Sequence, residues 1–422
     1  MKFLIYSKCG EGAGLGLRLQ NEGNEVRLFI KEREYRSVYK GILEQTLPRK
    51  LDGDTILVFD SSGFGSEADE FKKQGLKVFG GSRFADTLEL DRKFGLLYMR
   101  RHGIKIPETV EFHGVGAALG FLKEKDKEYV FKPSGDLPSK LTYKPCDAED
   151  LVRYLEFVGE EYDVEDFILQ EVVEGVAIST EYWVGSKGFI GPPNHTIEVK
   201  KFMDKDLGPS TGCSGNTVWA TDENDPIAKL LRNCEKDLVK EGYVGPIDLN
   251  VIVTPDGIYG LEWTPRFGLD AMPTLLQLLP DVGRVISDCV SGSTDKMKIG
   301  SFFASGLRVS IPPYPIEPET LTLVNKESPN YGVPIRGFDG YEENIYFYEI
   351  CRDEAGRLYH SDGTGAICVI SDVGDSIHGS FSLPYHVADG LKIPEKQYRT
   401  DLSEVIEECY EEVTESLEKV NA

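Results

Sequence analysis

One stretch of the sequence, from Gly245 to Gly268, constrains the fold most. It reads GPIDLNVIVTPDGIYGLEWTPRFG, in which an apolar strand turns at TPDG and returns as a second strand that ends at Glu262. Side chains two residues apart on a strand share a face, so Asp248 is expected beside Asn250. The same spacing places Glu262 beside Thr264, which completes an oxygen-rich patch suited to Mg²⁺. The alternative interpretation is a surface hairpin with ordinary acidic residues.

Composition limits the class of protein. The chain has 422 residues, more than one ordinary core holds, so about two to four packed units are expected. Apolar residues make up 40% and aromatic residues 10%, as in globular proteins. Asp and Glu number 71 against 47 Lys and Arg, a net charge of -24 that repels polymeric nucleic acid and anionic membranes. The expected partners are therefore small molecules, including anions that local loops or a metal ion can hold.

Cysteine usage and hydropathy indicate the compartment. The eight cysteines are scattered and include no C-x-x-C pair, so reduced thiols are expected and not a zinc site or a disulfide framework. The N-terminus MKFLIYSKCG has no signal-peptide core, and no run of ~18 apolar residues occurs. We therefore expect a soluble, cytoplasmic protein.

The order of predicted elements indicates three domains. Residues 1–105 alternate strands and helices, which is typical of a parallel sheet with helices on its faces. Residues 106–300 mix strands and helices as an α+β body does, and residues 301–422 have shorter strands before an acidic amphipathic helix. The predicted fold class is therefore α/β and α+β, multidomain. The predicted strands include Lys2–Tyr6, Glu25–Ile30, Thr55–Phe59, Leu76–Phe79, Leu307–Ile311, Tyr346–Ile350 and Ala366–Ile370, and the predicted helices Gly16–Asn21, Glu67–Gln74, Pro226–Lys240 and Asp401–Val420.

A glycine-rich turn, GEGAGLG, follows the first strand. Its spacing does not fit the dinucleotide pattern GxGxxG, because leucines stand where the last glycine would be required. Glycines between a strand and a helix N-terminus still allow backbone N–H groups to approach an anion, so Gly10, Gly12 and Gly14 are candidate substrate-binding residues. The alternative is a tight turn without a ligand.

Two later segments have the composition of nucleotide-binding elements. Lys132 ends a short strand, and the small residues that follow run to Lys140, so this loop could close over phosphates. Solvated lysines beside a turn are the alternative. About thirty residues further on, an apolar strand runs through Glu171, Val172, Val173 and Glu174 to a glycine, which suggests a hinge whose backbone could read an adenine edge, or an ordinary strand end.

Taken in order, these segments resemble the ATP-grasp superfamily and, within it, the glycinamide ribonucleotide synthetase (phosphoribosylamine–glycine ligase) family, over nearly the whole chain. FGGSRFADTLELDRKFGLLYMRRHGI follows that family's FGPS…LE…K…F…RHGI segment without a gap. GPSTGCSG resembles its GPNTGGMG loop, and EWTPRFG resembles its EFNxRFG. GAICVISDVGDSI and YRTD resemble its closing GRVL…GDT and YRTDI segments.

The resemblance implies an ATP-grasp fold with an N-terminal parallel-sheet domain (1–105), an ATP-grasp domain (106–300, lid about 125–172) and a small β-rich C-terminal domain (301–422). It implies ATP and Mg²⁺ (or Mn²⁺) as cofactors. Ala177 stands where a ribose-binding glutamate is expected, with Glu174 or Glu181 as substitutes, and Arg92 replaces a phosphate-binding lysine. The implied ATP-binding residues are Arg92, Lys132, Lys140, Glu171, Val172, Val173, Glu174 and Glu181, and the implied metal ligands are Asp248, Glu262 and Thr264.

The implied chemistry is activation of a carboxylate by the γ-phosphate, followed by attack of an amine on the acyl phosphate. Such catalysis depends on positioning and charge neutralisation and needs no triad. Arg266, with Lys140 in the lid loop, is the candidate catalytic residue for stabilising the transferring phosphoryl group, and a salt bridge with one of the many acids is the alternative. The implied substrate-binding residues are Gly10, Gly12, Gly14, Gly208, Pro209, Ser210, Thr211, Gly212, Arg266 and Gly268.

Departures from the family pattern gather in the substrate region. The family's GGREHA segment is replaced by GEGAGLG, and RFGDPE becomes RFGLDA. Three hypotheses follow: a phosphoribosylamine–glycine ligase, a ligase that joins glycine or another amino acid to a different amine such as a modified nucleotide, and a non-catalytic nucleotide-binding homologue. A monomer or a homodimer is expected.

Overall fold

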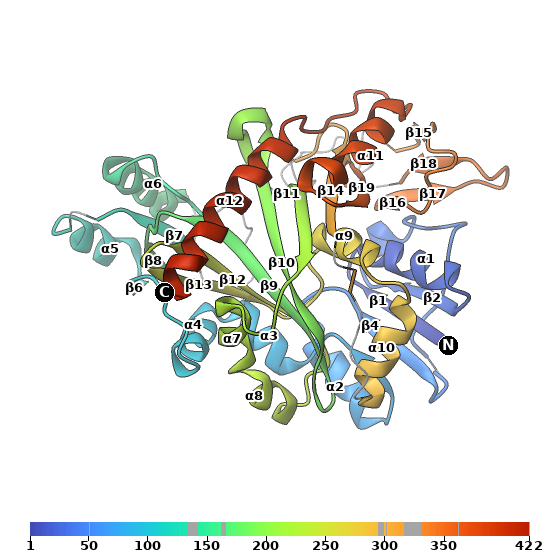
Figure 1. Cartoon of the computed structure of the whole chain (residues 1–422), viewed down its shortest axis with the longest axis horizontal. Coiled ribbons are helices and arrows are strands. Elements are labelled where there is room, and N and C mark those ends of the chain that lie inside the picture. The colour runs from blue at the N-terminus through green and yellow to red at the C-terminus, as the bar shows by residue number, and fades with distance from the viewer. Residues whose placement is uncertain are drawn as a thin grey trace.

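The computed structural model describes residues 1–49, 51–125, 127–133, 142–161, 166–293, 299–300, 302–315, 331–361 and 363–421. A parallel sheet lies at the N-terminal end, a long antiparallel sheet runs through the centre, and a small three-stranded subdomain projects at the other end (Figure 1). Within the described ranges, no helix is both long and apolar enough to cross a bilayer. The mixed α/β architecture confirms the predicted fold class.

The N-terminal sheet has five parallel strands in the order β3-β2-β1-β4-β5. Its central strand, β1, is almost wholly buried, which explains its unbroken apolar sequence. The predicted strands of this region are confirmed, but α1 begins at Ala13 and not at Gly16, because the chain already turns at Gly10 (φ 99°). The elements are β1 (Lys2–Ser7), α1 (Ala13–Asn21), β2 (Glu25–Ile30), η1 (Arg33–Tyr35), β3 (Glu44–Gln45), β4 (Thr55–Phe59), α2 (Gly65–Lys73), β5 (Lys77–Phe79), α3 (Arg83–Leu90) and α4 (Arg92–Arg101).

The central sheet has eight strands in the order β13-β12-β9-β10-β11-β14-β19-β16. Strands from the C-terminal third of the chain therefore extend the same sheet that carries the Asp248 hairpin. The elements are β9 (Val176–Gly185), β10 (Gly188–Met203), η3 (Asp204–Asp206), β11 (Leu207–Ala220), α7 (Pro226–Arg232), α8 (Glu235–Lys240), β12 (Gly245–Thr254), β13 (Gly257–Thr264), α9 (Ala271–Gln277), α10 (Val282–Ser291), β14 (Phe303–Ser310), β16 (Ile345–Phe347), β19 (Ala366–Gly374), α11 (Ile377–Gly390) and α12 (Leu402–Asn421).

The last helix, α12, crosses one face of this sheet (Figure 1). Trp219 of β11 packs against Tyr410 of α12 with ring centroids 5.2 Å apart. Because side chains alternate along a strand, Asn216 of β11 points to the opposite face, which carries the polar residues described below. The face opposite α12 is partly covered by α9, which packs against β11, β14 and β19, and there Asn216 donates to the carbonyl of Asp270 at 3.0 Å.

The projecting subdomain has its own small core. Its sheet has the order β6-β8-β7, and its buried side chains, such as Phe131, Leu155 and Phe167, form a cluster separate from the main core. The chain enters this subdomain between α4 and β6 and leaves it between β8 and β9, and the second of these connections contains the segment predicted as a hinge. The elements are β6 (Thr109–His113), α5 (Val115–Leu122), β7 (Tyr129–Pro133), α6 (Ala148–Glu161) and β8 (Asp166–Glu171); a further small sheet contains β15 (Pro334–Ile335), β17 (Ile350–Arg352) and β18 (Leu358–His360).

Three sequence-based predictions of elements were wrong. The helix predicted over Pro226–Lys240 is two helices, because the amide of Asn233 bonds to both Lys229 and Leu230 and the turn tightens there. The strand predicted over Tyr346–Ile350 is divided between β16 and β17, since the chain folds tightly where the amide of Ile350 bonds to the carbonyl of Tyr348. The segment GPSTGCSG, predicted as a loop, lies within strand β11.

Candidate active site

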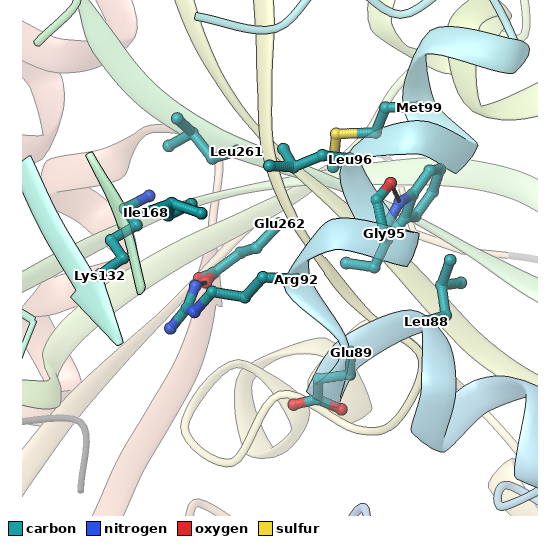
Figure 2. Close-up of a pocket in the computed structure, with 11 residues that line it drawn as sticks. Leu88, Glu89, Arg92, Gly95, Leu96, Met99, Lys132, Ile168, Leu261 and Glu262 are labelled. Atoms are coloured by element: carbon teal, nitrogen blue, oxygen red, sulfur yellow. Dashed lines mark hydrogen bonds and ion pairs between the residues drawn. The ribbon is translucent and has the colours of Figure 1, made fainter. Parts of the chain in front are cut away.

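A recess lies where α3, α4, the β6-β8-β7 sheet and the central sheet meet. Its empty volume is about 310 Å³, and Figure 2 shows the charged ends of Arg92 and Glu262 side by side, with Lys132 next to them on a separate element. The residues that line it are Leu88, Glu89, Arg92, Gly95, Leu96, Met99, Lys132, Ile168, Leu261, Glu262 and Trp263. Apolar walls with a few convergent charges are typical of a small-molecule site.

Arg92 is placed by the start of α4. Asp91 caps this helix by accepting from the amide of Phe94 at 2.9 Å, which fixes Arg92 in the first turn. The Arg92 Nε donates to the carbonyl of Pro133 at 2.9 Å, and its Nη1 lies 4.0 Å from Glu262 Oε2. Arg92 therefore joins the end of β7 to the metal-binding strand predicted from the sequence.

Lys132 is held by hydrogen bonds within the β6-β8-β7 sheet. Its Nζ donates to Gln170 Oε1 at 2.7 Å, and Gln170 in turn donates to Thr109 Oγ1 at 3.1 Å. Burial lowers the pKa of Lys132 to about 8; Glu262 partly counteracts this shift, and Arg92 and Lys200 add to it. Lys132 therefore changes its protonation state near pH 8, and an added negative charge nearby would raise its pKa.

Glu262 is surrounded by cations. Desolvation in the recess opposes its ionisation, but Lys200, Lys132, Arg92 and Arg266 together hold its pKa below the ordinary value for a glutamate. Its side chain is still 47% exposed, so the carboxylate is ionised and can be reached by a ligand. An ionised, accessible carboxylate is what a magnesium site requires.

A row of polar side chains continues from Glu262 across the face of the central sheet that lies opposite α12. The register places Asp248 opposite both Thr264 and Glu181. Burial, followed by the charge of Glu198, raises the pKa of Asp248 to about 7, and its Oδ1 has no hydrogen-bond partner. Burial and Asp248 raise the pKa of Glu181 to about 8, and Glu181 accepts from Trp183 Nε1 at 2.8 Å. This environment places Glu181 beside Asp248 and gives no support to a ribose contact.

The donor set fits a hard divalent cation with few protein ligands. No group of three His, Cys, Asp or Glu side chains forms a metal cluster among the residues the structure describes. Mg²⁺ needs only one or two carboxylates because it keeps several waters. Glu262 is ionised, Asp248 has an unpartnered oxygen, and the Thr264 hydroxyl accepts from Asn250 Nδ2 at 3.1 Å. The fit rests on the two carboxylates, with Thr264 as a weaker third donor.

Arg266 follows β13 and forms an ion pair that the sequence analysis had considered only as an alternative. Its Nε and Nη2 each lie 3.0 Å from Glu89 Oε1, and its Nη1 donates to the carbonyl of Phe267 at 3.0 Å. The pairing holds the planar guanidinium in a fixed orientation between α3 and the sheet. The positive charge of Arg266 also interacts favourably with the carboxylates of Glu262 and Glu11.

The predicted substrate segment lies at the start of β11. Gly208, Pro209, Ser210 and Gly212 are exposed, and register shifts between β10 and β11 occur beside them. Thr211 Oγ1 donates to the carbonyl of Lys200 at 2.9 Å, which ties this segment to the polar row. An irregular strand end with exposed backbone can present N–H groups to a small carboxylate, so the prediction for these residues stays open.

The glycine turn before α1 is filled by other parts of the protein. The Gly12 amide donates to Asp60 Oδ2 and the Leu15 amide donates to Tyr346 Oη, both at 2.7 Å. A Cβ on Gly14 would lie 2.4 Å from Tyr346 Cε1, so the aromatic ring rests on the helix end. The turn is therefore not an open anion site.

The remaining predicted residues belong to the hinge and the lid. Glu171 and Val172 donate their amides to the carbonyls of Glu108 and Glu128, at 2.8 and 2.9 Å. Val173 is half-buried and Glu174 is exposed at the junction with the central sheet, which is where the hinge was predicted. Gly268 accepts from the amide of Met272 at 2.8 Å and begins the turn into α9. Lys140 lies outside the described residues.

Sequence reasoning missed three charged residues of this site. Glu198 and Lys200 lie on β10, and Glu11 lies in the glycine turn. The signal for the first two was present, because polar residues alternate with Ile197 and Val199 in NHTIEVKKF. Glu11 was overlooked because the turn was examined for its glycines alone.

Raising the pH above 8 is expected to weaken the binding of a phosphate ligand at Lys132, and ATP, the cofactor that the resemblance implies, is the ligand for the test. Lys132 has a lowered pKa of about 8, so it loses its proton as the pH rises through that value and then offers no charge to a phosphate. Bound phosphate favours the protonated lysine, so binding near and above this pH takes up protons. Calorimetric titration with ATP between pH 7 and 9.5 should show affinity falling by up to about tenfold per pH unit above 8. Lys132→Arg should flatten this profile, and an equally steep profile in that variant would contradict the assignment.

Comparison with known sequences finds phosphoribosylamine–glycine ligases and bifunctional purine biosynthetic proteins among the relatives. No protein-family model matches the chain. The phosphoribosylamine–glycine ligase of Lactococcus lactis subsp. lactis is 25% identical over 345 residues, which cover 79% of this chain and 79% of that enzyme.

Comparison with solved structures supports the same fold. The phosphoribosylamine–glycine ligase of Thermotoga maritima superposes with a TM-score of 0.74 at 19% identity and covers 95% of this chain and 100% of that one. The biotin carboxylase domain of Hydrogenobacter thermophilus 2-oxoglutarate carboxylase, solved with MgADP and bicarbonate, gives a TM-score of 0.65 at 12% identity, over 94% of this chain and 91% of that one. The fold is therefore that of the ATP-grasp enzymes, and the sequence is similar over 79% of its length to phosphoribosylamine–glycine ligase, which confirms the resemblance seen in the motifs.

Proposed function

We propose that this protein is an ATP-dependent carboxylate–amine ligase of the phosphoribosylamine–glycine ligase kind. The observation that carries the proposal is that Arg92, Lys132 and Glu262, from α4, β7 and β13, line one recess. Two cations can bind the phosphates of a nucleoside triphosphate, and an ionised carboxylate in this arrangement can bind its metal ion. Glycine is the first carboxylate substrate to test, because the relatives are glycine ligases by name.

The reaction has two balanced steps. A carboxylate oxygen of the amino acid attacks the γ-phosphorus of ATP, the bond to the bridging oxygen breaks, and ADP leaves. The amine nitrogen then attacks the acyl carbon of the acyl phosphate, inorganic phosphate leaves, and the nitrogen loses a proton to give the amide. Both steps spread charge over phosphoryl oxygens, so fixed cations and not a nucleophilic side chain supply the catalysis.

The residues of the chain have distinct roles in this scheme. Lys132 and Arg92 bind and orient the phosphates, and Mg²⁺ or Mn²⁺ held by Glu262 with Asp248 would neutralise charge on the transferring group. Arg266 is fixed by Glu89 and faces the reacting centre with a planar cation. The exposed backbone from Gly208 to Gly212 holds the small carboxylate.

Trapping the acyl phosphate tests this function without knowledge of the amine. Hydroxylamine, ATP, Mg²⁺ and glycine should give glycine hydroxamate and ADP in equal amounts, because hydroxylamine attacks the same acyl carbon. ATP binding without hydroxamate from glycine or from any other amino acid would favour the non-catalytic hypothesis, for which Thr264 and Ala177 are the sequence arguments. Omitting glycine and chelating Mg²⁺ are the matched controls.

Replacing Arg266 with lysine is expected to lower turnover more than ATP affinity. Lysine keeps the charge but cannot make the paired contact with Glu89 and also face the transferring group. We expect hydroxamate formation at saturating ATP to fall by roughly 10²-fold, as when one transition-state donor is removed. Steady-state kinetics and calorimetric ATP binding separate the two effects, and an equal loss in both would make Arg266 an ATP ligand.

A further inference from the structure

We infer that the buried ion pair between Asp270 and Arg308 has a positioning role: it fixes the turn that follows Arg266 against β11, the strand that bears the predicted substrate segment. This inference rests on the proposed ligase function and assigns two positioning residues to the same site. The pair lies where the sequence departs from the family pattern, since RFGDPE becomes RFGLDA there and the acid stands one place later.

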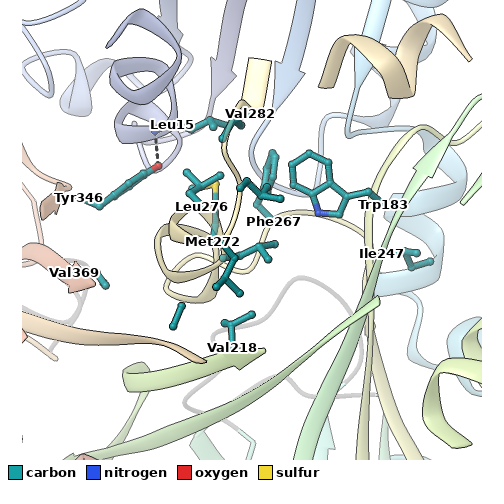
Figure 3. Close-up of a cluster of buried hydrophobic side chains, with 14 of the residues drawn as sticks. Leu15, Trp183, Val218, Ile247, Phe267, Met272, Leu276, Val282, Tyr346 and Val369 are labelled. Atoms are coloured by element: carbon teal, nitrogen blue, oxygen red, sulfur yellow. Dashed lines mark hydrogen bonds between the residues drawn. The ribbon is translucent and has the colours of Figure 1, made fainter. Parts of the chain in front are cut away.

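Two buried side chains anchor the ends of the turn between β13 and α9. Phe267 precedes the turn, is 1% exposed and packs against Trp183 with ring centroids 5.8 Å apart. Met272 follows the turn at the start of α9 and is 3% exposed. Figure 3 shows both side chains within one apolar cluster. Apolar contacts are non-directional, so they hold the ends of the turn without orienting the polar groups between them.

Directional contacts reach the turn from three other parts of the chain. The Tyr348 hydroxyl, between β16 and β17, donates to the carbonyl of Leu269 at 2.8 Å and lies 3.2 Å from Asp270 Oδ1. Arg308 Nη2, from β14, forms an ion pair with the same Asp270 oxygen. Asn216 Nδ2, from β11, donates to the carbonyl of Asp270 at 3.0 Å. Together these groups restrain both the side chain and the backbone of Asp270.

The ion pair is shielded from water. The side chains of Arg308 and Asp270 are 9% and 4% exposed. The guanidinium carbon of Arg308 lies 4.8 Å from the ring centroid of Tyr348 and 5.4 Å from that of Tyr314, so two aromatic rings hold the planar group. Desolvation offsets much of the attraction in a buried pair, so its main contribution here is to the geometry of the turn and not to stability.

The turn connects two parts of the proposed site. Arg266, paired with Glu89, stands four positions before Asp270. On the other side, Asp270 Oδ2 lies 3.9 Å from the place that a Cβ on Gly212 would take, and Asn216 belongs to the same strand as Gly212. A shift of the turn would therefore change the distance between the Arg266 guanidinium and the substrate segment. A misplacement of about 1 Å can cost about 100-fold in rate.

A variant without either charge tests the inference. Arg308→Met combined with Asp270→Asn leaves no buried ion uncompensated and changes side-chain volume little. We expect hydroxamate formation from glycine at saturating ATP to slow about tenfold or more and the KM for glycine to rise about threefold, with the calorimetric Kd for ATP within about twofold of the wild type. Arg308→Lys should have an intermediate rate because it keeps the charge. Unchanged kcat and KM in the folded double variant would overturn the inference, as would an equal loss of ATP affinity.

A milder variant, Tyr348→Phe, decides the case in which the double variant does not fold. It removes the hydroxyl that contacts Leu269 and Asp270 but leaves the ion pair, so the hydroxamate rate should fall about threefold with ATP binding unchanged. In that case a wild-type rate would overturn the inference. Arg232→Met is the matched control, because Arg232 also lies over a tyrosine ring and pairs with a carboxylate, that of Glu223 at 2.9 Å. It should change neither the rate nor the KM for glycine.

Amide hydrogen exchange separates this inference from the ligase function. If the wild type forms no hydroxamate, the ligase proposal fails by itself, and exchange in whichever variant folds still decides the positioning role. Faster exchange in residues 266–272 and 208–216 together, with α4 unchanged, is the expected result. Faster exchange confined to β14, faster exchange throughout the protein, or no change would overturn the inference.

Discussion

The Glu262→Gln variant is expected to form hydroxamate roughly 10²–10³-fold more slowly than the wild type, the loss seen when one fixed transition-state charge or donor is removed. Glutamine keeps the size of the side chain but removes the charge that faces Lys200, Lys132, Arg92 and Arg266. It also offers only a carbonyl oxygen to a divalent cation. The measurement is glycine hydroxamate formation over a Mg²⁺ series, in which the loss should persist at saturating metal.

The fold should survive this change, since the Glu262 side chain is 47% exposed. Circular dichroism and the melting temperature should therefore match the wild type. Glu111→Gln, an exposed glutamate on β6 that pairs with Lys93 at 2.7 Å, is the matched control and should keep full activity. Near-wild-type turnover in Glu262→Gln would remove the hairpin from the mechanism.

The part of the site that could be predicted from sequence is the part encoded locally. The turn TPDG and the period-two pattern predict the hairpin, and the structure confirms it and pairs Asp248 with Thr264 and Glu262 with Asn250. The motif order then brought Arg92 and Lys132 to the same site as Glu262, because relatives with the same order have the same fold. Local pattern and motif order together were sufficient for these residues.

Residues brought in by strand pairing could not be found in the same way. Glu198 approaches Asp248 only because β9 lies between β10 and β12 in the sheet, and that order is a property of the whole topology. The partner of Arg266 was equally hidden, since Glu89 is 177 positions away on α3. The excess of acidic residues predicted that Arg266 would form an ion pair, but composition did not identify Glu89 as its partner.

The glycine turn shows the same limit more sharply. Its glycines correctly indicate that another group packs closely against the backbone. They do not indicate whether this group belongs to a ligand or to another part of the chain. Asp60 lies 48 positions from Gly12, and Tyr346 lies 331 positions from Leu15. Contacts at such separations require the tertiary structure, and they turn an apparent anion site into a packed one.

Replacing Arg399 with alanine is expected to destabilise the protein by about 2 kcal/mol, because a fully buried side chain loses its charge-assisted hydrogen bonds to Asp401 and Asp206, whose own side chains are 24% and 60% exposed. The Arg399 side chain is fully buried; it donates to Asp401 Oδ1 and Oδ2 at 2.8 and 2.9 Å, to Asp206 Oδ1 at 2.8 Å and to the carbonyl of Lys201 at 3.1 Å. These contacts tie the YRTD segment to the turn between β10 and β11. A lower urea midpoint by circular dichroism is the expected result.

The same turn leads into the exposed backbone from Gly208 to Gly212, so its loosening should also be visible in kinetics. In Arg399→Ala, the KM for glycine should rise more than the KM for ATP, and Arg399→Lys should recover part of both the stability and the affinity because one charged donor remains. Arg357→Ala is the matched control, since this arginine pairs with Asp353 at 2.7 Å on the surface with a 69% exposed side chain and should change little. If Arg399→Ala behaved like Arg357→Ala, the buried network would have no role in holding the substrate segment, and the YRTD resemblance would carry no structural meaning.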